Sequence, residues 1–138
     1  MTNTKKGQDM VYDKIALLSQ KGNEALITLM IIMIHCDNKV KLIEQERLDS
    51  ALMSMNWKNQ LSIDLFYQNM INKVRTARSN FSTDSLIKKS VNDISEELDK
   101  QTFLDLLQNI CLFDKEISHQ EINIINICTN QYLLQTAE

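Results

Sequence analysis

The sequence contains no proline and only two glycines among its 138 residues. These two residue types supply most of the sharp turns between short strands, so their scarcity argues against a fold of many small strands. It also excludes a glycine-rich phosphate-binding loop, which needs several closely spaced glycines. Leucine, isoleucine, methionine, lysine, glutamine and glutamate are common instead, and most of these residues favour helices.

Cysteine is sparse as well, and the three thiols, Cys36, Cys111 and Cys128, form no C-x-x-C pair. Each lies beside apolar residues, which is typical of small buried thiols in a reducing compartment. The first twenty residues lack the apolar core and cleavage site of a signal peptide. The apolar run at residues 25–34 is too short to cross a bilayer, which takes about 20 apolar residues. We therefore expect a cytoplasmic protein without direct membrane insertion.

The formal net charge is only −3 at pH 7. Nucleic-acid-binding domains usually carry a strongly basic balance, so no nucleic acid is expected as a partner. Basic residues gather between residues 73 and 89, and we interpret this segment as a solvated helix face. Because 43% of the residues are apolar, a folded chain is expected. Its length predicts one domain, residues 1–138.

The spacing of apolar residues predicts an all-α bundle of about seven helices. The expected helices are residues 9–19, 24–36, 44–54, 61–78, 84–94, 96–111 and 119–132. The second is apolar nearly all round, which is typical of a helix buried at the centre of a bundle. Gly22 is expected to end the first helix and Asn23 to cap the second. Ser95 is expected to cap the sixth.

A short acidic pattern occurs twice, 77 positions apart: an aspartate, an aliphatic residue three positions later, and a glutamate seven positions later. The two copies are Asp37, Val40 and Glu44, and Asp114, Ile117 and Glu121. The same shift aligns apolar positions of the flanking helices, namely Met30 with Leu107, Leu48 with Ile125, and Ala51 with Cys128. We interpret this as a duplicated helical hairpin, which predicts two pseudo-symmetric halves. A chance alignment of helical periods is the alternative.

One interpretation of the acidic pattern is a metal-binding site. Asp37 follows an apolar helix, whose C-terminus carries partial negative charge, while Glu44 is expected in the first turn of the next helix. A turn that brings the two carboxylates together would make them repel. A divalent cation would relieve this repulsion, and oxygen-only ligands suit Ca²⁺ or Mg²⁺. The same argument applies to Asp114 and Glu121 in the second copy.

Helix-terminal structure alone is the other interpretation of these acids. Ser118 and Glu121 have the spacing of a capping box, in which the glutamate bonds back to the serine amide. Asp37 and Asn38 together are typical of a simple turn. An EF-hand is a poor fit, because its third and fifth ligand positions would be lysines and its sixth position lacks the required glycine.

Other catalytic or metal chemistry finds little support. His35 and His119 each lie two residues from a motif acid, but a zinc site needs three or four converging ligands. Cys36 and Cys111 belong to apolar helices, and no oxyanion loop is visible. We therefore predict no catalytic residue and no cofactor other than a divalent cation.

The duplicated hairpin with its acidic loops resembles the TerB-like family, named for a bacterial tellurite-resistance protein. The resemblance rests on the two copies of the acidic pattern and spans about residues 10–133. It implies an all-helical domain of about seven helices in two pseudo-symmetric halves, with no assigned enzymatic reaction. It also implies that Asp37, Glu44, Asp114 and Glu121 are candidate metal ligands. Where the family usually has glycine after the aspartate, this chain has Asn38 and Lys115.

The resemblance further implies a bacterial stress-response function, with other proteins of such a system as partners. The alternative is a helical protein-interaction module whose acidic loops are only structural. Its expected anchors are the basic segment 73–89 and an exposed Trp57 or Tyr132. An enzyme that acts on a phosphate ester through metal-bound carboxylates is a third interpretation. The oligomeric state is left open.

Overall fold

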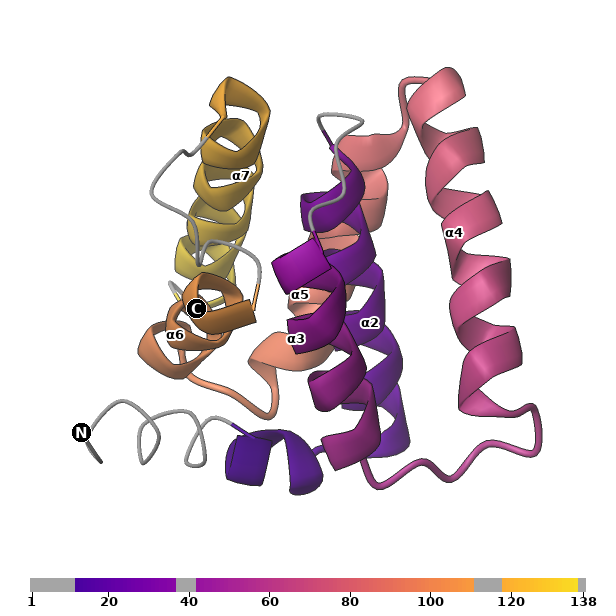
Figure 1. Cartoon of the computed structure of the whole chain (residues 1–138). Helices are drawn as coiled ribbons and strands as arrows, with labels where there is room; N and C mark the ends of the chain where they lie inside the picture. The colour runs from indigo at the N-terminus through magenta and orange to yellow at the C-terminus, as the bar shows by residue number, and fades with distance from the viewer. Residues whose placement is uncertain (1–11, 37–41, 111–117, 137–138) are drawn as a thin grey trace.

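The computed structural model describes residues 12–36, 42–110 and 118–136 (Figure 1). Within these ranges every regular element is an α-helix, which confirms the predicted all-α bundle. The helices are α2 (Gln20–His35), α3 (Leu42–Ser54), α4 (Ile63–Ser79), α5 (Thr83–Ser95), α6 (Lys100–Ile110) and α7 (His119–Thr136). A short helical segment at residues 12–16 precedes them. Six of the seven predicted helices thus lie within a few residues of their expected bounds, and the first is described only in part.

The core is built around α2, as its composition predicts. All residues from Ala25 to Ile34 are buried, since a helix that is apolar on every side must be covered on every side. The most extensive packing joins α2 with α5 and α5 with α7. Figure 1 shows α4 at one edge of the bundle and α6 and α7 at the opposite side. Each fully buried Leu, Ile or Met side chain contributes about 1.5–3 kcal/mol to folding.

The outer helices bury only a stripe. In α4 the buried residues are Phe66, Met70 and Val74, which are spaced four apart and therefore lie on one face of the helix. In α5 the stripe includes Ile87, Val91 and Ile94. These stripes cover α2, while the remaining faces of both helices stay largely exposed.

The start of α2 differs from the prediction. Gly22 does not end a helix and Asn23 does not cap one, because α2 begins at Gln20 and both residues are buried in its first turns. The N-cap is Ser19, whose Oγ accepts a hydrogen bond from the Gly22 amide at 3.2 Å. Asn23 instead donates from Nδ2 to the carbonyl oxygen of Asn56 at 3.0 Å. It thereby ties α2 to the segment after α3.

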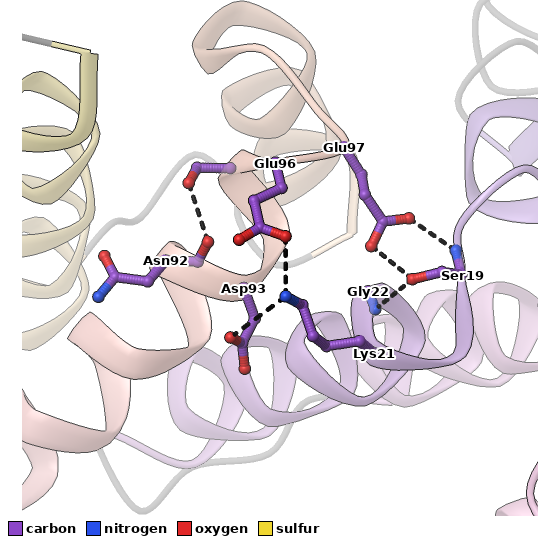
Figure 2. Close-up of polar contacts among 8 residues, drawn as sticks. Ser19, Lys21, Gly22, Asn92, Asp93, Glu96 and Glu97 are labelled. Carbon is purple, nitrogen blue, oxygen red and sulfur yellow. Dashed lines mark hydrogen bonds and ion pairs between the residues drawn. The ribbon is translucent and has the colours of Figure 1, made fainter. Parts of the chain in front are cut away.

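A distant carboxylate explains this early start. Glu97, in the turn between α5 and α6, accepts hydrogen bonds from the Ser19 amide at 2.7 Å and from Ser19 Oγ at 2.6 Å (Figure 2). A Cβ on Gly22 would stand 2.6 Å from Glu97 Oε2. Glycine is therefore needed here for space rather than for a turn. A carboxylate at this end is also favoured by the helix dipole.

An ion pair extends the same junction. Lys21 Nζ lies 2.8 Å from Glu96 Oε2 and 4.0 Å from Asp93 Oδ1 (Figure 2). The hydrogen bond to Glu96 is the main reason that the pKa of Lys21 lies above its usual value. Because these groups are solvent-exposed, their attraction is screened and contributes little to stability. The Glu97–Ser19 bonds are therefore the more specific part of the junction.

The start of α6 is a second correction. Ser95 does not cap α6, because it is the last residue of α5 and its Oγ donates to the Asn92 carbonyl at 3.0 Å. The residue that bonds the first turn of α6 is Asp99, whose Oδ1 accepts from the Thr102 amide at 2.7 Å. This bond is the main reason that the pKa of Asp99 lies below its usual value. Buried Leu98 pins the intervening turn to the core.

The helix positions agree with the 77-residue repeat. A shift of 77 carries Leu42, the first residue of α3, onto His119, the first residue of α7. Pairs that are buried in both copies are Leu26 with Phe103, Leu29 with Leu106, Met30 with Leu107, Glu44 with Glu121, Ala51 with Cys128, and Met55 with Tyr132. Ile125, by contrast, is only partly buried where its counterpart Leu48 is fully buried. A pseudo-symmetric relation between the two halves stays a prediction.

Of the two cysteines that the structure describes, one is buried as predicted and the other is only partly buried. Cys128 is fully buried, and burial raises the pKa of its thiol to about 12. Cys36 is only half-buried, at the end of α2, and Cys111 lies outside the described residues. Among the helices of the described ranges, none combines the length and hydrophobicity that a bilayer crossing requires.

We expect the effect of Gly22→Ala on stability to depend on Glu97. In a Glu97→Ala background, alanine should stabilise α2 by about 0.5–1 kcal/mol, because it loses less backbone entropy than glycine. With Glu97 present the gain should vanish or reverse, because the new methyl group displaces the carboxylate from Ser19. Urea unfolding of the four proteins in this double-mutant cycle measures the coupling. If Gly22→Ala changed stability equally with and without Glu97, the Glu97 carboxylate would not be crowding the new methyl group.

Candidate functional site

The glutamates of the two acidic patterns occupy the same position in their helices. Glu44 lies in the first turn of α3 and Glu121 in the first turn of α7, as the sequence predicts for Glu44. Their exposed fractions are only 6% and 7%. Glutamate is rarely buried to this degree without a partner. Both carboxylates are therefore held within the fold rather than displayed on its surface.

Glu121 has a structural partner. Its Oε1 accepts from the Ser118 amide at 3.0 Å, while Ser118 Oγ accepts from the Glu121 amide at 3.1 Å. This is the reciprocal capping box that the spacing of the two residues predicts. The start of α7 therefore explains the burial of Glu121 without a metal ion. The first copy has Lys41 at the position that matches Ser118, so Glu44 has no equivalent serine.

The aspartates of the predicted ligand set, Asp37 and Asp114, lie outside the described residues. The same holds for Val40 and Ile117, which were expected to complete the two patterns. Among the residues that the structure does describe, no three His, Cys, Asp or Glu side chains gather as a metal site would require. The assignment of all four carboxylates as ligands therefore stays a prediction.

The described residues that flank the two acidic segments lie near one another. Arg47 in α3 donates from Nη1 to the carbonyl oxygen of Asn109 in the last turn of α6 at 2.8 Å. Cys36, which directly precedes Asp37, lines the same cavity as Gln120, which directly precedes Glu121. Of the helices next to the two acidic patterns, α3 thus contacts α6, while α2 and α7 line one cavity.

That cavity lies between four helices of the described part of the molecule. It has a volume of about 490 Å³ and lies where the C-terminal parts of α2 and α4 meet the N-terminal parts of α5 and α7. Small-molecule sites commonly fall in the range of about 300–1,000 Å³. Its apolar wall consists of Ile31, Ile32, Ile71, Val74, Ile87, Ile124 and Ile127. The cavity is therefore large enough for a small organic molecule.

The polar side of the cavity carries more positive than negative charge. Arg75 and Arg78 of α4 face Asp84 of α5 across it, and His35 of α2 completes this side. Arg78 Nη1 donates to the carbonyl oxygen of His35 at 3.1 Å, which satisfies a terminal carbonyl of α2. Burial is the main reason that the pKa of His35 lies below its usual value, and the two guanidinium groups add to the effect. The ring's Nε2 is buried without a hydrogen-bond partner.

This cavity was not predicted from the sequence. One signal was present: Ile71, Val74, Arg75 and Arg78 recur three and four positions apart, so they lie on one face of α4. By itself this pattern predicts only an ordinary amphipathic helix that ends in a basic segment. No sequence pattern predicts that the N-terminal part of α7 lies across a cavity from this face of α4.

The exposure expected for the aromatic anchors of a protein-interaction module is wrong for Tyr132 and only partly met by Trp57. Tyr132 is only 2% exposed, and its hydroxyl donates to the Leu98 carbonyl at 3.1 Å. Trp57 is half-buried, with Nε1 donating to the Leu61 carbonyl at 2.8 Å and its ring centroid 5.1 Å from that of Phe66. Tyr132 is therefore part of the core, and Trp57 packs against it.

Comparison of the chain with protein-family models, with curated proteins and with solved structures gives no match. The resemblance to the TerB-like family, and the function it implies, therefore stay predictions.

The capping and ligand roles of Glu121 can be separated by substitution. Glutamine caps as glutamate does, so Glu121→Gln should change the unfolding free energy little. Ser118→Ala removes the cap and should destabilise the protein by about 1 kcal/mol. Urea unfolding measures both, with Ser85→Ala, an exposed serine in α5, as the control. A large loss of stability in Glu121→Gln would show that the charge, rather than the cap, matters at this position.

Proposed function

We propose that this protein is a non-enzymatic, TerB-like domain of a bacterial stress response, with acidic loops that bind a divalent cation such as Ca²⁺ or Mg²⁺. One observation carries the proposal. Glu44 and Glu121 stand 77 positions apart in the sequence, yet each is a buried glutamate in the first turn of a helix that follows an acidic segment. Such a match is what a duplicated acidic segment would leave, and the proposal adds a ligand role to the capping role of Glu121.

Physical chemistry supports a cation in this setting. A carboxylate that already has protein partners can still coordinate a cation through its remaining lone pairs. Oxygen ligands suit a hard ion such as Ca²⁺ or Mg²⁺. Lys39, Lys41 and Lys115 add positive charge within the two segments, so binding is expected to be weak and sensitive to salt.

The duplication itself belongs to the proposal. Two pseudo-symmetric halves would place one acidic segment after α2 and one after α6, in equivalent positions. The contact from Arg47 to Asn109 and the shared cavity at Cys36 and Gln120 support a common side for both segments. Other proteins of a stress-response system are the proposed partners, in the cytoplasm of a bacterium. No reaction is proposed.

Metal binding should be measurable by titration calorimetry of the chelated protein with Ca²⁺, and then with Mg²⁺ and Mn²⁺. We expect saturable binding, with a stability gain of about 2.7 kcal/mol at a free-ion concentration one hundred times the Kd. The double variant Asp37→Ala with Asp114→Ala should abolish it. Glu121→Gln should weaken it while preserving the cap of α7.

The matched control is the double variant Asp49→Ala with Asp64→Ala, which removes the same charge from exposed positions of α3 and α4. It should bind the ion as the unaltered protein does. Absence of heat and of stabilisation with all three ions would disprove the metal site. Equal loss of binding in the control would point to general charge screening instead.

A protein-interaction module is the second candidate, and one observation favours it. A surface groove of about 540 Å³ between α4 and α5 is lined by Lys73, Thr76, Leu86 and Lys89, among others. Beside it, in the turn between the two helices, Phe81 is 96% exposed at a left-handed φ of 55°. Such a backbone is uncommon for a bulky residue. An exposed aromatic ring next to basic side chains suits an acidic partner.

This alternative predicts a stoichiometric partner that survives chelation. A pull-down in the presence of a chelator should retain it, and the double variant Lys73→Glu with Lys89→Glu should release it. Lys58→Glu with Lys88→Glu is the control, because these exposed lysines lie outside the groove. Loss of the partner on chelation alone would favour the metal-linked function instead.

A further inference from the structure

We propose that the cavity between α2, α4, α5 and α7 binds a single-chain amphiphile with an anionic head, such as a medium-chain alkyl carboxylate or alkyl phosphate. The chain would lie against the isoleucine wall, and the head would pair with Arg75 at the opening. The proposal does not depend on a bound divalent cation, so its test is separate from that of the metal site.

The wall of the cavity selects for an aliphatic group. The seven aliphatic residues that line it come from four different helices, and no aromatic side chain is among the lining residues within the described ranges. Flat aromatic ligands gain much of their affinity from stacking on rings, which is not offered here. A flexible alkyl chain needs only apolar surface, and it gains affinity roughly in proportion to the area it removes from water.

The opening selects for negative charge. Arg75 is exposed and makes no hydrogen bond or ion pair with the described residues. Arg78 is oriented by its bond to the His35 carbonyl, which fixes a second guanidinium at the same opening. Asp84 is the single carboxylate among the lining residues that the structure describes. The guanidinium group of Arg75 is therefore available to an anionic group at this opening.

Backbone and side-chain donors add to this preference. The first turn of α5 opens at the same place through Thr83 and Asp84. Its N-cap, Ser82, makes no side-chain hydrogen bond to that turn, so the first amides of α5 have no serine partner there. Helix N-termini with unsatisfied amides favour anions. Gln120 and Asn123 of α7 bring amide groups to the lining as well.

Other small occupants fit the lining less well. A neutral alkane or alcohol would cover the apolar wall but would give Arg75 no counter-charge. An inorganic anion would pair with Arg75 but leave the isoleucines facing water. A molecule with both parts satisfies the whole lining, which is why the amphiphile is the occupant that the side chains favour.

Titration calorimetry with decanoate and decyl phosphate, both below their micelle concentrations, tests this directly in the full-length protein. We expect binding of one molecule per chain and a rise in Tm for at least one of the two. Decanol has the alkyl chain without the anionic head, and inorganic phosphate has the anionic head without the chain. Each should bind at least about tenfold more weakly than the amphiphiles. The relative affinity of the two amphiphiles shows whether the opening prefers a carboxylate or a phosphate head.

Arg75→Gln should weaken the binding of the amphiphile by about tenfold, because it removes a charge-assisted hydrogen bond. Lys73→Gln is the matched control, since it removes one positive charge from the same helix two positions away, outside this cavity. It should leave affinity within about twofold, a change too small for a lost ion pair. Ile127→Phe, at a half-buried wall position, should reduce binding by filling the space.

Circular dichroism confirms that each variant is folded before its affinity is interpreted. Equal affinity of decanol and decanoate would overturn the proposal, because it would show that the head is not recognised. Unchanged affinity in both Arg75→Gln and Ile127→Phe would also overturn it, because the ligand would then bind elsewhere. Absence of binding by either amphiphile would show that the cavity holds only water.

Discussion

The arrangement of this molecule depends on one constraint, that α2 is apolar on every side and must be surrounded. Ten consecutive buried residues, from Ala25 to Ile34, leave no face that can tolerate water. The helix that packs on it most extensively is α5, from the second half of the chain, and α7 packs in turn on α5. The hydrophobic effect has no direction of its own. Specific polar contacts must therefore fix how the covering helices are placed.

The junction at Ser19 is one such contact. Glu97 completes the cap of α2 from the turn between α5 and α6, and Gly22 provides the room for its carboxylate. At the other end of α2, Arg78 of α4 bonds the carbonyl of His35. The two ends of the central helix are thus each satisfied by a charged side chain from another element, a pattern that sets the position of α2 relative to its neighbours.

The fold could be predicted largely from local pattern, because long apolar periods specify helices and a helix without a polar face specifies burial. The capping box at Ser118 was predictable for the same reason, since its partners are three residues apart. The cap of α2 was not, because Asn23 is a good local candidate and the true partner, Glu97, is remote in sequence. Ser95 failed likewise, since buried Leu98 moves the start of α6 beyond it. The cavity at the helix ends depends on four helices at once, which no single-helix pattern can express.

The long reach between Ser19 and Glu97, 78 residues apart, has a consequence for how the chain is made. Synthesis proceeds from the N-terminus at about 5–20 residues per second, so α2 emerges several seconds before α5, the helix that packs on it most extensively, exists to cover it. During that interval the most hydrophobic segment of the protein is exposed on the nascent chain and its cap is incomplete. The half-made chain, rather than the finished domain, is then the species most prone to aggregation.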